Sequence, residues 1–253
     1  MYSEKQFIEL EQEELKVTNE SLMALNLVIA NAHGNIEQAI SNFYQQYGKD
    51  GVVTYAEARK WVSDQDHRRR LTALSALVAL EFGSLLSSSN TIFGSMLTAI
   101  VGKENGFFGT SISSNKMLQK PWGEDNTTWL ERLENDVNVW NVRVAADIKR
   151  AILQRKNFNE ILNILEKRFG SIQTVMRTLG LTESTATGSL TRQAIFQELG
   201  INKYQFYAKA DERTCDECGS LHGHIFPMSA YEVGVTASPI HPRCRCWEVP
   251  IMG

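Results

Sequence analysis

The sequence predicts an α+β protein, in which a predominantly α-helical N-terminal region precedes a small β or α+β module at the C-terminus. Two observations predict this class. Apolar residues recur at intervals of three and four through the first two hundred residues, as in amphipathic helices. From residue 203 on, polar residues alternate with apolar or aromatic ones, and all 4 cysteines lie in this last part of the chain.

Composition and charge narrow the functional classes. The chain has 253 residues, 43% of them hydrophobic, which is enough for a buried core. A formal net charge of −3 gives no bulk attraction to nucleic acid or anionic lipid. The most apolar stretch, residues 71–90, contains Glu81, so we expect a buried helix and no membrane contact. The charged N-terminus has no signal-peptide pattern, which indicates folding in a cytoplasm.

We expect three regions, 1–120, 121–200 and 201–253. In the first, Gly34 is expected to interrupt one helix, and the helix that follows is expected to stop at Gly48. The string "TYAE" at residues 54–57 has the form of a capping box, so a further helix is expected from there through Trp61.

A helical pair is expected over residues 64–119, with its break at the string "SSSN" and an irregular loop over about 102–120. In the second region, one helix is expected from about Thr128 to Lys156. The next is expected to end at Gly170.

A last helix is expected to begin at a Thr182 or Ser184 cap and to stop at Gly200. The string "KYQFYAKA" from residue 203 then reads as a strand with Tyr204, Phe206 and Ala208 on one face. The closing string "CWEVPI" is expected to form a final strand that pairs with it.

The cysteines form two pairs, Cys215 with Cys218 and Cys244 with Cys246, separated by 25 residues. Paired spacings in one short module of a reduced, cytoplasmic chain favour a structural zinc site that staples the module; free buried thiols are the alternative. Cysteines one residue apart on a strand point to opposite faces. We therefore expect Cys215, Cys218 and Cys246 as ligands, with Cys244 or His241 as the fourth.

Several features argue against an enzyme. The sequence has no H-x-E or HEXXH motif, no P-loop and no G-x-S-x-G elbow. Four good ligands close a zinc site, and closed sites are structural. The acids Asp211 and Glu212 abut Arg213, so we expect ionic hydrogen bonds that fix the first cysteine pair. His222 and His224 are expected to be exposed or hydrogen-bonded, not ligands.

The strings "ELGINKYQFYAKADERTCDECGSLHGHIFPM" and "SPIHPRCRCWEVP" resemble the C-terminal module of the phage Mu F-like minor head proteins, or phage head morphogenesis proteins. That pattern is an aromatic strand, D-x-R-T-C-x-x-C, a Gly turn leading to Phe, and H-P-x-C-R-C. Residues 52–61 and 121–133 resemble minor capsid segments more weakly. Family members commonly carry Arg-Thr-Glu upstream, where this chain has Leu181 before Thr182 and Glu183. We expect Glu183 to pair with Arg213.

The resemblance implies a virion component present in few copies, inside the capsid or at the portal vertex, after assembly in the host cytoplasm. Its expected partners are the portal protein, major capsid or scaffolding subunits and, through Arg243 and Arg245, non-specific phage DNA. Its expected roles are head assembly, genome packaging and genome release. The alternatives are a metal-dependent nuclease or toxin-type effector, and a zinc-ribbon nucleic-acid-binding protein, which the acidic balance disfavours.

Overall fold

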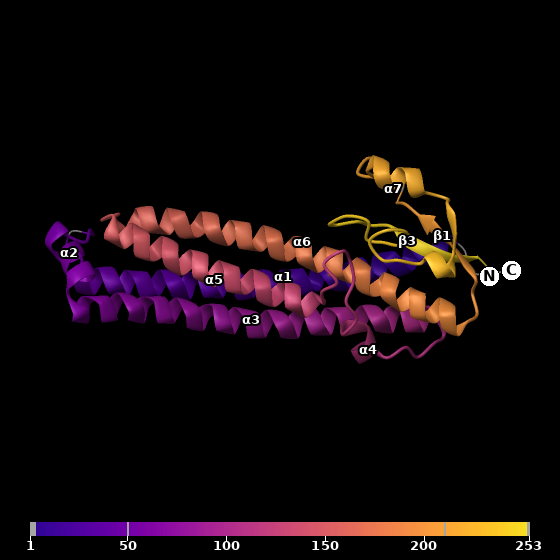
Figure 1. The fold of residues 1–253 in the computed structure, drawn as a ribbon, viewed down its shortest axis with the longest axis horizontal. Helices are drawn as coiled ribbons and strands as arrows, with labels where there is room; N and C mark the ends of the chain where they lie inside the picture. Colours follow the sequence, from indigo (N-terminus) through magenta and orange to yellow (C-terminus); the bar gives the residue numbers. More distant parts are fainter. Residues whose placement is uncertain (1–3, 50, 210, 252–253) are drawn as a thin grey trace. The chain divides into compact units, whose positions relative to one another are not determined.

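The computed structural model describes residues 4–49, 51–209 and 211–251. Figure 1 shows long helices followed by a small C-terminal sheet. The helices are α1 (Glu4–Tyr47), α2 (Tyr55–Ser63), α3 (Gln65–Phe108), α4 (Ser114–Leu118), α5 (Trp129–Leu153), α6 (Phe158–Glu198) and α7 (Asp216–Leu221). The strands are β1 (Lys203–Tyr207), β2 (Ile225–Pro227) and β3 (Trp247–Ile251), and a 3-10 turn spans Met228–Ala230. The predicted α+β class is confirmed.

The sheet has the order β2-β1-β3, and both pairings are antiparallel. Strand β3 pairs with β1 along its whole length, from Lys203 opposite Ile251 to Tyr207 opposite Trp247. The predicted return of the final strand is therefore confirmed. The predicted inner face is confirmed too, since Tyr204 and Phe206 are 0% exposed and Ala208 is 2% exposed.

The chain divides into two compact units. The first, here called the sheet unit, comprises Met1–Met23, Thr91–Arg132 and Met176–Gly253. The second, here called the helical unit, comprises Ala24–Asn90 and Leu133–Val175. These units do not follow the three regions expected from the sequence, because α1, α3 and α6 each contribute to both.

The sheet unit has one main core in which helices and sheet share side chains. Its buried members are Phe7, Phe108, Ala186, Leu190, Ile195, Phe196, Tyr204, Tyr231, Val233, Ala237 and Trp247. Phe7 comes from α1, Phe108 from α3 and Phe196 from α6, so three helices pack on the strand residues. The sheet is thus held by helices as well as by its own hydrogen bonds.

The helical unit is a bundle of segments of α1, α3, α5 and α6 (Figure 1). His33 of α1 and Phe82 of α3 both stack on Phe169 of α6, with ring centroids 4.7 and 6.1 Å apart. The Tyr44 hydroxyl donates to the carbonyl of Lys156 at 2.7 Å. These contacts tie three of the four helices together by side chains from each.

Two predicted helix breaks at glycine are wrong. Helix α1 continues through Gly34, and α6 continues through Gly170 and through Thr182 and Ser184. A glycine inside a helix costs about 1 kcal/mol relative to alanine. Burial of flanking side chains on one face, such as Ile36 in α1, outweighs that cost.

The break expected at "SSSN" and the loop expected over about 102–120 are also wrong in part. Helix α3 runs unbroken to Phe108, because Ser89 is buried and Phe108 packs in the core of the sheet unit. Only residues 109–113 separate it from α4. There the Asn105 side chain stabilises the turn, accepting from the amide of Ile112 at 2.8 Å and donating to its carbonyl at 2.9 Å.

Other predicted boundaries are confirmed. Thr54 caps α2, and its hydroxyl accepts from the amide of Glu57 at 3.3 Å. Helix α1 ends one residue before Gly48, and α6 ends two residues before Gly200, whose φ of +68° is easily adopted only by glycine. The helix expected from Thr128 starts one residue later and ends at Leu153.

The apolar stretch 71–90 lies in α3 and buries only one face. Leu74, Val78 and Phe82 are buried, whereas Leu77 and Leu80 are 48% and 68% exposed. Among the described residues, α3 is the one helix long and apolar enough to cross a membrane, with a mean hydropathy of 1.5 over its best window, of which 28% is buried. The expectation of no membrane contact therefore stays a prediction.

Candidate metal centre

The first cysteine pair is shaped by the start of α7. Cys215 is the N-cap of this helix, with φ −76° and ψ 162°, and its Sγ accepts from the amide of Cys218 at 3.4 Å. A cap residue and the residue three positions later lie on the same side of a first helical turn. The spacing C-x-x-C therefore brings both sulfur atoms to one point.

The second pair lies in a turn just before β3. The amide of Cys244 donates to the carbonyl of His241 at 3.1 Å, and Arg243 has a φ of +62°. Because β3 begins only at Trp247, Cys244 and Cys246 do not follow the alternation of a strand. The sequence-based expectation that Cys244 and Cys246 point to opposite faces, as on a strand, is therefore wrong.

The five candidate ligands meet in two overlapping groups. Cys215, Cys218 and His241 place their ligand atoms within 4.8 Å of one another, and so do Cys218, Cys244 and Cys246. The imidazole Nε2 of His241 lies 3.2 Å from the Sγ of Cys215 and 3.3 Å from that of Cys218. The Sγ atoms of Cys218 and Cys244 are 3.7 Å apart. Cys218 therefore belongs to both groups.

The donor set fits a metal ion. Thiolate sulfur and imidazole nitrogen are the ligands of structural zinc and of other borderline or soft metals. The sulfur atoms are enclosed by a small apolar cluster that contains Phe206, Ala208, Leu221, Phe226 and Ile240. Apolar burial disfavours isolated thiolates, which an ion among them stabilises. These residues could hold a metal ion.

The two thiols of each cysteine pair differ in pKa. The amide of Cys218 lowers the pKa of Cys215, and the thiol of Cys246 lowers the pKa of Cys244 to about 6. Burial raises the pKa of Cys218, and the hydrogen bond to Cys244 together with burial raises that of Cys246. In each pair, therefore, one thiol has a lowered pKa and the other a raised one.

The two halves of the centre are also joined by an ion pair. Arg245 donates to both carboxylate oxygens of Asp211, at 2.5 and 2.6 Å. Asp211 thus forms ionic hydrogen bonds with Arg245, and Arg213 donates to it through its amide at 2.9 Å. The Arg213 side chain is exposed.

The expected pairing of Glu183 with Arg213 is wrong. Glu183 is 2% exposed and accepts from Arg132 Nη1 at 2.8 Å and from Trp122 Nε1 at 2.9 Å. Both partners come from the segment that enters α5. The acid therefore ties α6 to residues 122–132 and not to the cysteine module.

Arg243 also makes contacts with α6. Its amide donates to the Thr182 hydroxyl at 3.0 Å, and its Nε donates to the Thr178 hydroxyl at 2.8 Å. Next to it, the Thr185 hydroxyl donates to the carbonyl of Cys244 at 3.0 Å. Helix α6 thus positions the loop that carries the second cysteine pair. A DNA contact by Arg243 and Arg245 stays a prediction.

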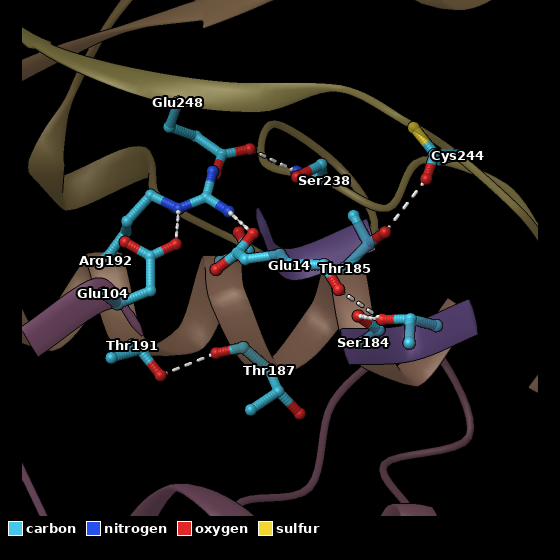
Figure 2. A network of polar contacts seen from close by, with 12 residues as sticks. Glu14, Glu104, Ser184, Thr185, Thr187, Thr191, Arg192, Ser238, Cys244 and Glu248 are labelled. Atoms are coloured by element: carbon cyan, nitrogen blue, oxygen red, sulfur yellow. Dashed lines mark hydrogen bonds and ion pairs between the residues drawn. The ribbon is translucent and has the colours of Figure 1, made fainter. Parts of the chain in front are cut away.

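Sequence reasoning missed a buried ionic cluster in the same unit. Figure 2 shows Arg192 of α6 among carboxylates from three other elements. Its Nε is 2.6 Å from Glu104, its Nη1 is 3.1 Å from Glu248 and its Nη2 is 4.0 Å from Glu14. Arg192 is 3% exposed. No spacing rule finds this cluster, because its members lie far apart in the sequence.

The two donor groups consist of thiols and one imidazole. Catalysis at a metal needs an open coordination position and a general base nearby. No carboxylate of the described residues belongs to either donor group, and Asp211 is engaged by Arg245. His222 lies outside both groups, and its Nδ1 accepts from the amide of Ala208 at 3.1 Å.

One family comparison matches the chain. The model of the family described as "Phage Mu protein F like protein" matches residues 142–249. This segment contains the C-terminal part of α5, all of α6 and all five candidate ligands. No curated protein and no solved structure matches the chain. The resemblance expected from the cysteine motif is confirmed over residues 142–249, the segment that matches the family of phage Mu protein F-like proteins.

Proposed function

We propose that the chain is a minor head protein of a tailed phage or prophage, bound near the portal and stapled by a structural zinc ion. The family indicates a phage head morphogenesis protein and hence a virion-associated one. The single observation that carries the proposal is that the matched segment, 142–249, contains the complete Cys/His centre. Portal binding, genome packaging and genome release are the finer parts of the proposal.

Distances within the centre support zinc. Bonds of about 2.3 Å to sulfur and about 2.0 Å to nitrogen place neighbouring ligands of a tetrahedral zinc ion roughly 3.5–3.8 Å apart. The separation of Cys218 and Cys244 sulfurs is 3.7 Å, and His241 lies 3.2–3.3 Å from two sulfurs. Small movements of His241 would bring these atoms to ligand spacing.

We propose Cys215, Cys218, His241 and Cys244 as the four ligands. Three pairs among them are already in contact, and Cys218 links the two groups. Cys246 then acts as a hydrogen-bonding neighbour of the Cys244 sulfur, the contact that lowers the pKa of Cys244. Such a neighbour orients a ligand without binding the metal.

The helical unit offers a surface for a protein partner. Leu27 of α1 and Leu77 and Leu80 of α3 are 68%, 48% and 68% exposed. Leu77 and Leu80 lie three positions apart and hence on one face of α3, and exposed apolar patches mark protein contact sites. We propose that a portal or capsid subunit covers them.

The experiment is to purify heads from cells in which the phage carries a tagged full-length chain, and to quantify this chain against the portal protein. We expect it to cosediment with heads in few copies. The double variant Leu77→Lys with Leu80→Lys should lose this association. Asn135→Lys with Asn138→Lys is the matched control, since both residues are exposed on α5 at the same spacing. If the tagged chain does not sediment with the heads and stays at the top of the density gradient, the proposal is contradicted.

A further inference from the structure

A pocket of about 330 Å³ lies in the sheet unit, next to the metal centre. Helix α1 and helix α6 form two of its walls, and the segment after β1 and the loop before β3 form the rest. Several residues labelled in Figure 2 belong to its lining, namely Glu14, Ser184, Thr185, Arg192 and Cys244. Phe7, Leu10 and Trp247 contribute apolar surface.

The lining of this pocket is rich in positive charge, although the chain is acidic as a whole. Its cationic members are Arg177, Arg192, Lys209, Arg213, Arg243 and Arg245, against the acids Glu11 and Glu14. Burial, and next the Glu104 carboxylate, raise the pKa of Glu14 well above its ordinary value. The pocket therefore attracts anions.

Half of these cations already have acidic partners. Lys209 pairs with Glu11 at 2.8 Å, Arg245 pairs with Asp211, and Arg192 pairs with Glu104 and Glu248. The other three guanidinium groups belong to Arg177, Arg213 and Arg243. Among the described residues, none of them forms an ion pair with an acid. They come from α6, from the segment after β1 and from the loop before β3, so three separate elements bring them to one pocket.

A second observation also indicates a ligand that accepts hydrogen bonds. Trp247 is 5% exposed and lines the pocket, and its indole N–H has no acceptor among the described residues. A buried donor without a partner loses its hydrogen bond to water and gains none in return, so such groups are rarely left unsatisfied. An anion in the pocket would supply the acceptor.

We propose that this pocket binds a phosphate group, with Arg177, Arg213 and Arg243 as its cationic contacts. Three guanidinium groups from three elements of one pocket offer more donors than a carboxylate with two oxygens can accept, and a phosphate group has more acceptor oxygens. If the head-protein role proposed above holds, the source of the phosphate is the backbone of the phage DNA. Free phosphate or a nucleotide offers the same chemistry.

The test uses the purified full-length chain and two probes, a short fluorescent DNA duplex followed by anisotropy and inorganic phosphate followed by tryptophan fluorescence. We expect Arg177→Gln with Arg213→Gln to weaken DNA binding at least tenfold. The slope of log affinity against log salt should fall by about 2, roughly 1 for each lost phosphate contact. Circular dichroism and metal content should be unchanged.

The matched control is Arg150→Gln with Lys167→Gln, which removes the same charge from a basic groove of the helical unit. This control variant should retain the DNA affinity of the unchanged chain and the same slope of log affinity against log salt. DNA binding that the test variant weakens and the control does not supports the proposal, with DNA as the source. Phosphate binding without DNA binding supports the pocket with a free phosphate as the source.

Three results overturn the proposal: no binding of either probe, equal losses in the test and control variants, or competition by an acidic peptide as strong as that by DNA. Head association of the test variant, measured separately by sedimentation, distinguishes this failure from failure of the proposed function. If the test variant enters heads and has unchanged DNA affinity, the proposal that the pocket binds phosphate is wrong, while the proposed head-protein role is unaffected.

Discussion

Arg245 donates two hydrogen bonds to Asp211, from Nη1 to Oδ2 at 2.5 Å and from Nη2 to Oδ1 at 2.6 Å. Asp211 precedes the first cysteine pair, and Arg245 lies inside the second. The hydrogen bonds from Arg245 hold the pKa of Asp211 well below its usual range. The pair therefore joins the two halves of the motif by a contact separate from the sulfur atoms.

Replacing Arg192 by Met should destabilise the sheet unit strongly. Glu104 and Glu248, both 0% exposed, would lose the cation that compensates their burial. Removing one partner of a buried ion pair costs about 3–5 kcal/mol. The free energy of unfolding in urea measures this loss.

Arg168→Met is the matched control, because Arg168 contacts Asp147 at 2.7 Å but is 44% exposed. An exposed pair contributes about 0–1 kcal/mol. Equal losses in the two variants would show that the Arg192 cluster does not hold the unit together.

Two glycines of α6 should respond differently to replacement by alanine. Gly170 has nothing within 4 Å of an added Cβ, so Gly170→Ala should stabilise by about 1 kcal/mol through helix propensity. At Gly180 an added Cβ would lie 2.8 Å from Leu22 Cδ2 in a packed core, and overpacking of this kind costs about 1–3 kcal/mol. Gly180→Ala should therefore be neutral or destabilising. Urea unfolding of both variants measures these changes. A higher free energy of unfolding for Gly180→Ala would contradict the close contact between Gly180 and Leu22.

Acid should weaken the contact between Asp125 and Arg132. Hydrogen bonds from Arg132 lower the pKa of Asp125 to about 2, below the value of about 3.9 in an unfolded chain. The pair therefore stabilises the fold fully above pH ~4, and this contribution disappears as the pH falls through about 2. Asp125→Asn should lower stability slightly at pH 6 and have a smaller effect at pH 3. A larger effect at the lower pH would reverse the assigned sign.

Local signals in the sequence predict several helix ends and the strands β1 and β3 correctly, but not the short strand β2. The Thr54 cap, the stop at Gly200 and the pairing of β1 with β3 each depend on residues close in the sequence or on simple alternation. The breaks predicted at Gly34 and Gly170 are wrong because tertiary packing outweighs the small propensity of a single glycine.

Spacing likewise predicts which residues form the centre but not their full surroundings. The two cysteine pairs and the neighbouring His241 are recognisable from their motif, and the structure brings their five donor atoms together in two overlapping groups. The partners of Glu183 and Arg192 cannot be predicted in this way. Arg132, Glu104 and Glu248 reach them only through the packing of separate helices and β3.

The most direct test of the account is the metal content of the full-length chain, measured together with limited proteolysis before and after chelation. We predict about one zinc ion per chain, lost in Cys218→Ser and retained in His224→Ala, whose exposed imidazole lies outside both donor groups.

Chelation should expose the segments 211–222 and 240–246 to protease while the long helices keep their circular dichroism signal, because binding energy at such a site is folding energy. Cleavage at these segments with the helices intact is the result the account predicts. Purified protein without stoichiometric metal, or an unchanged digestion pattern after complete chelation, would contradict it.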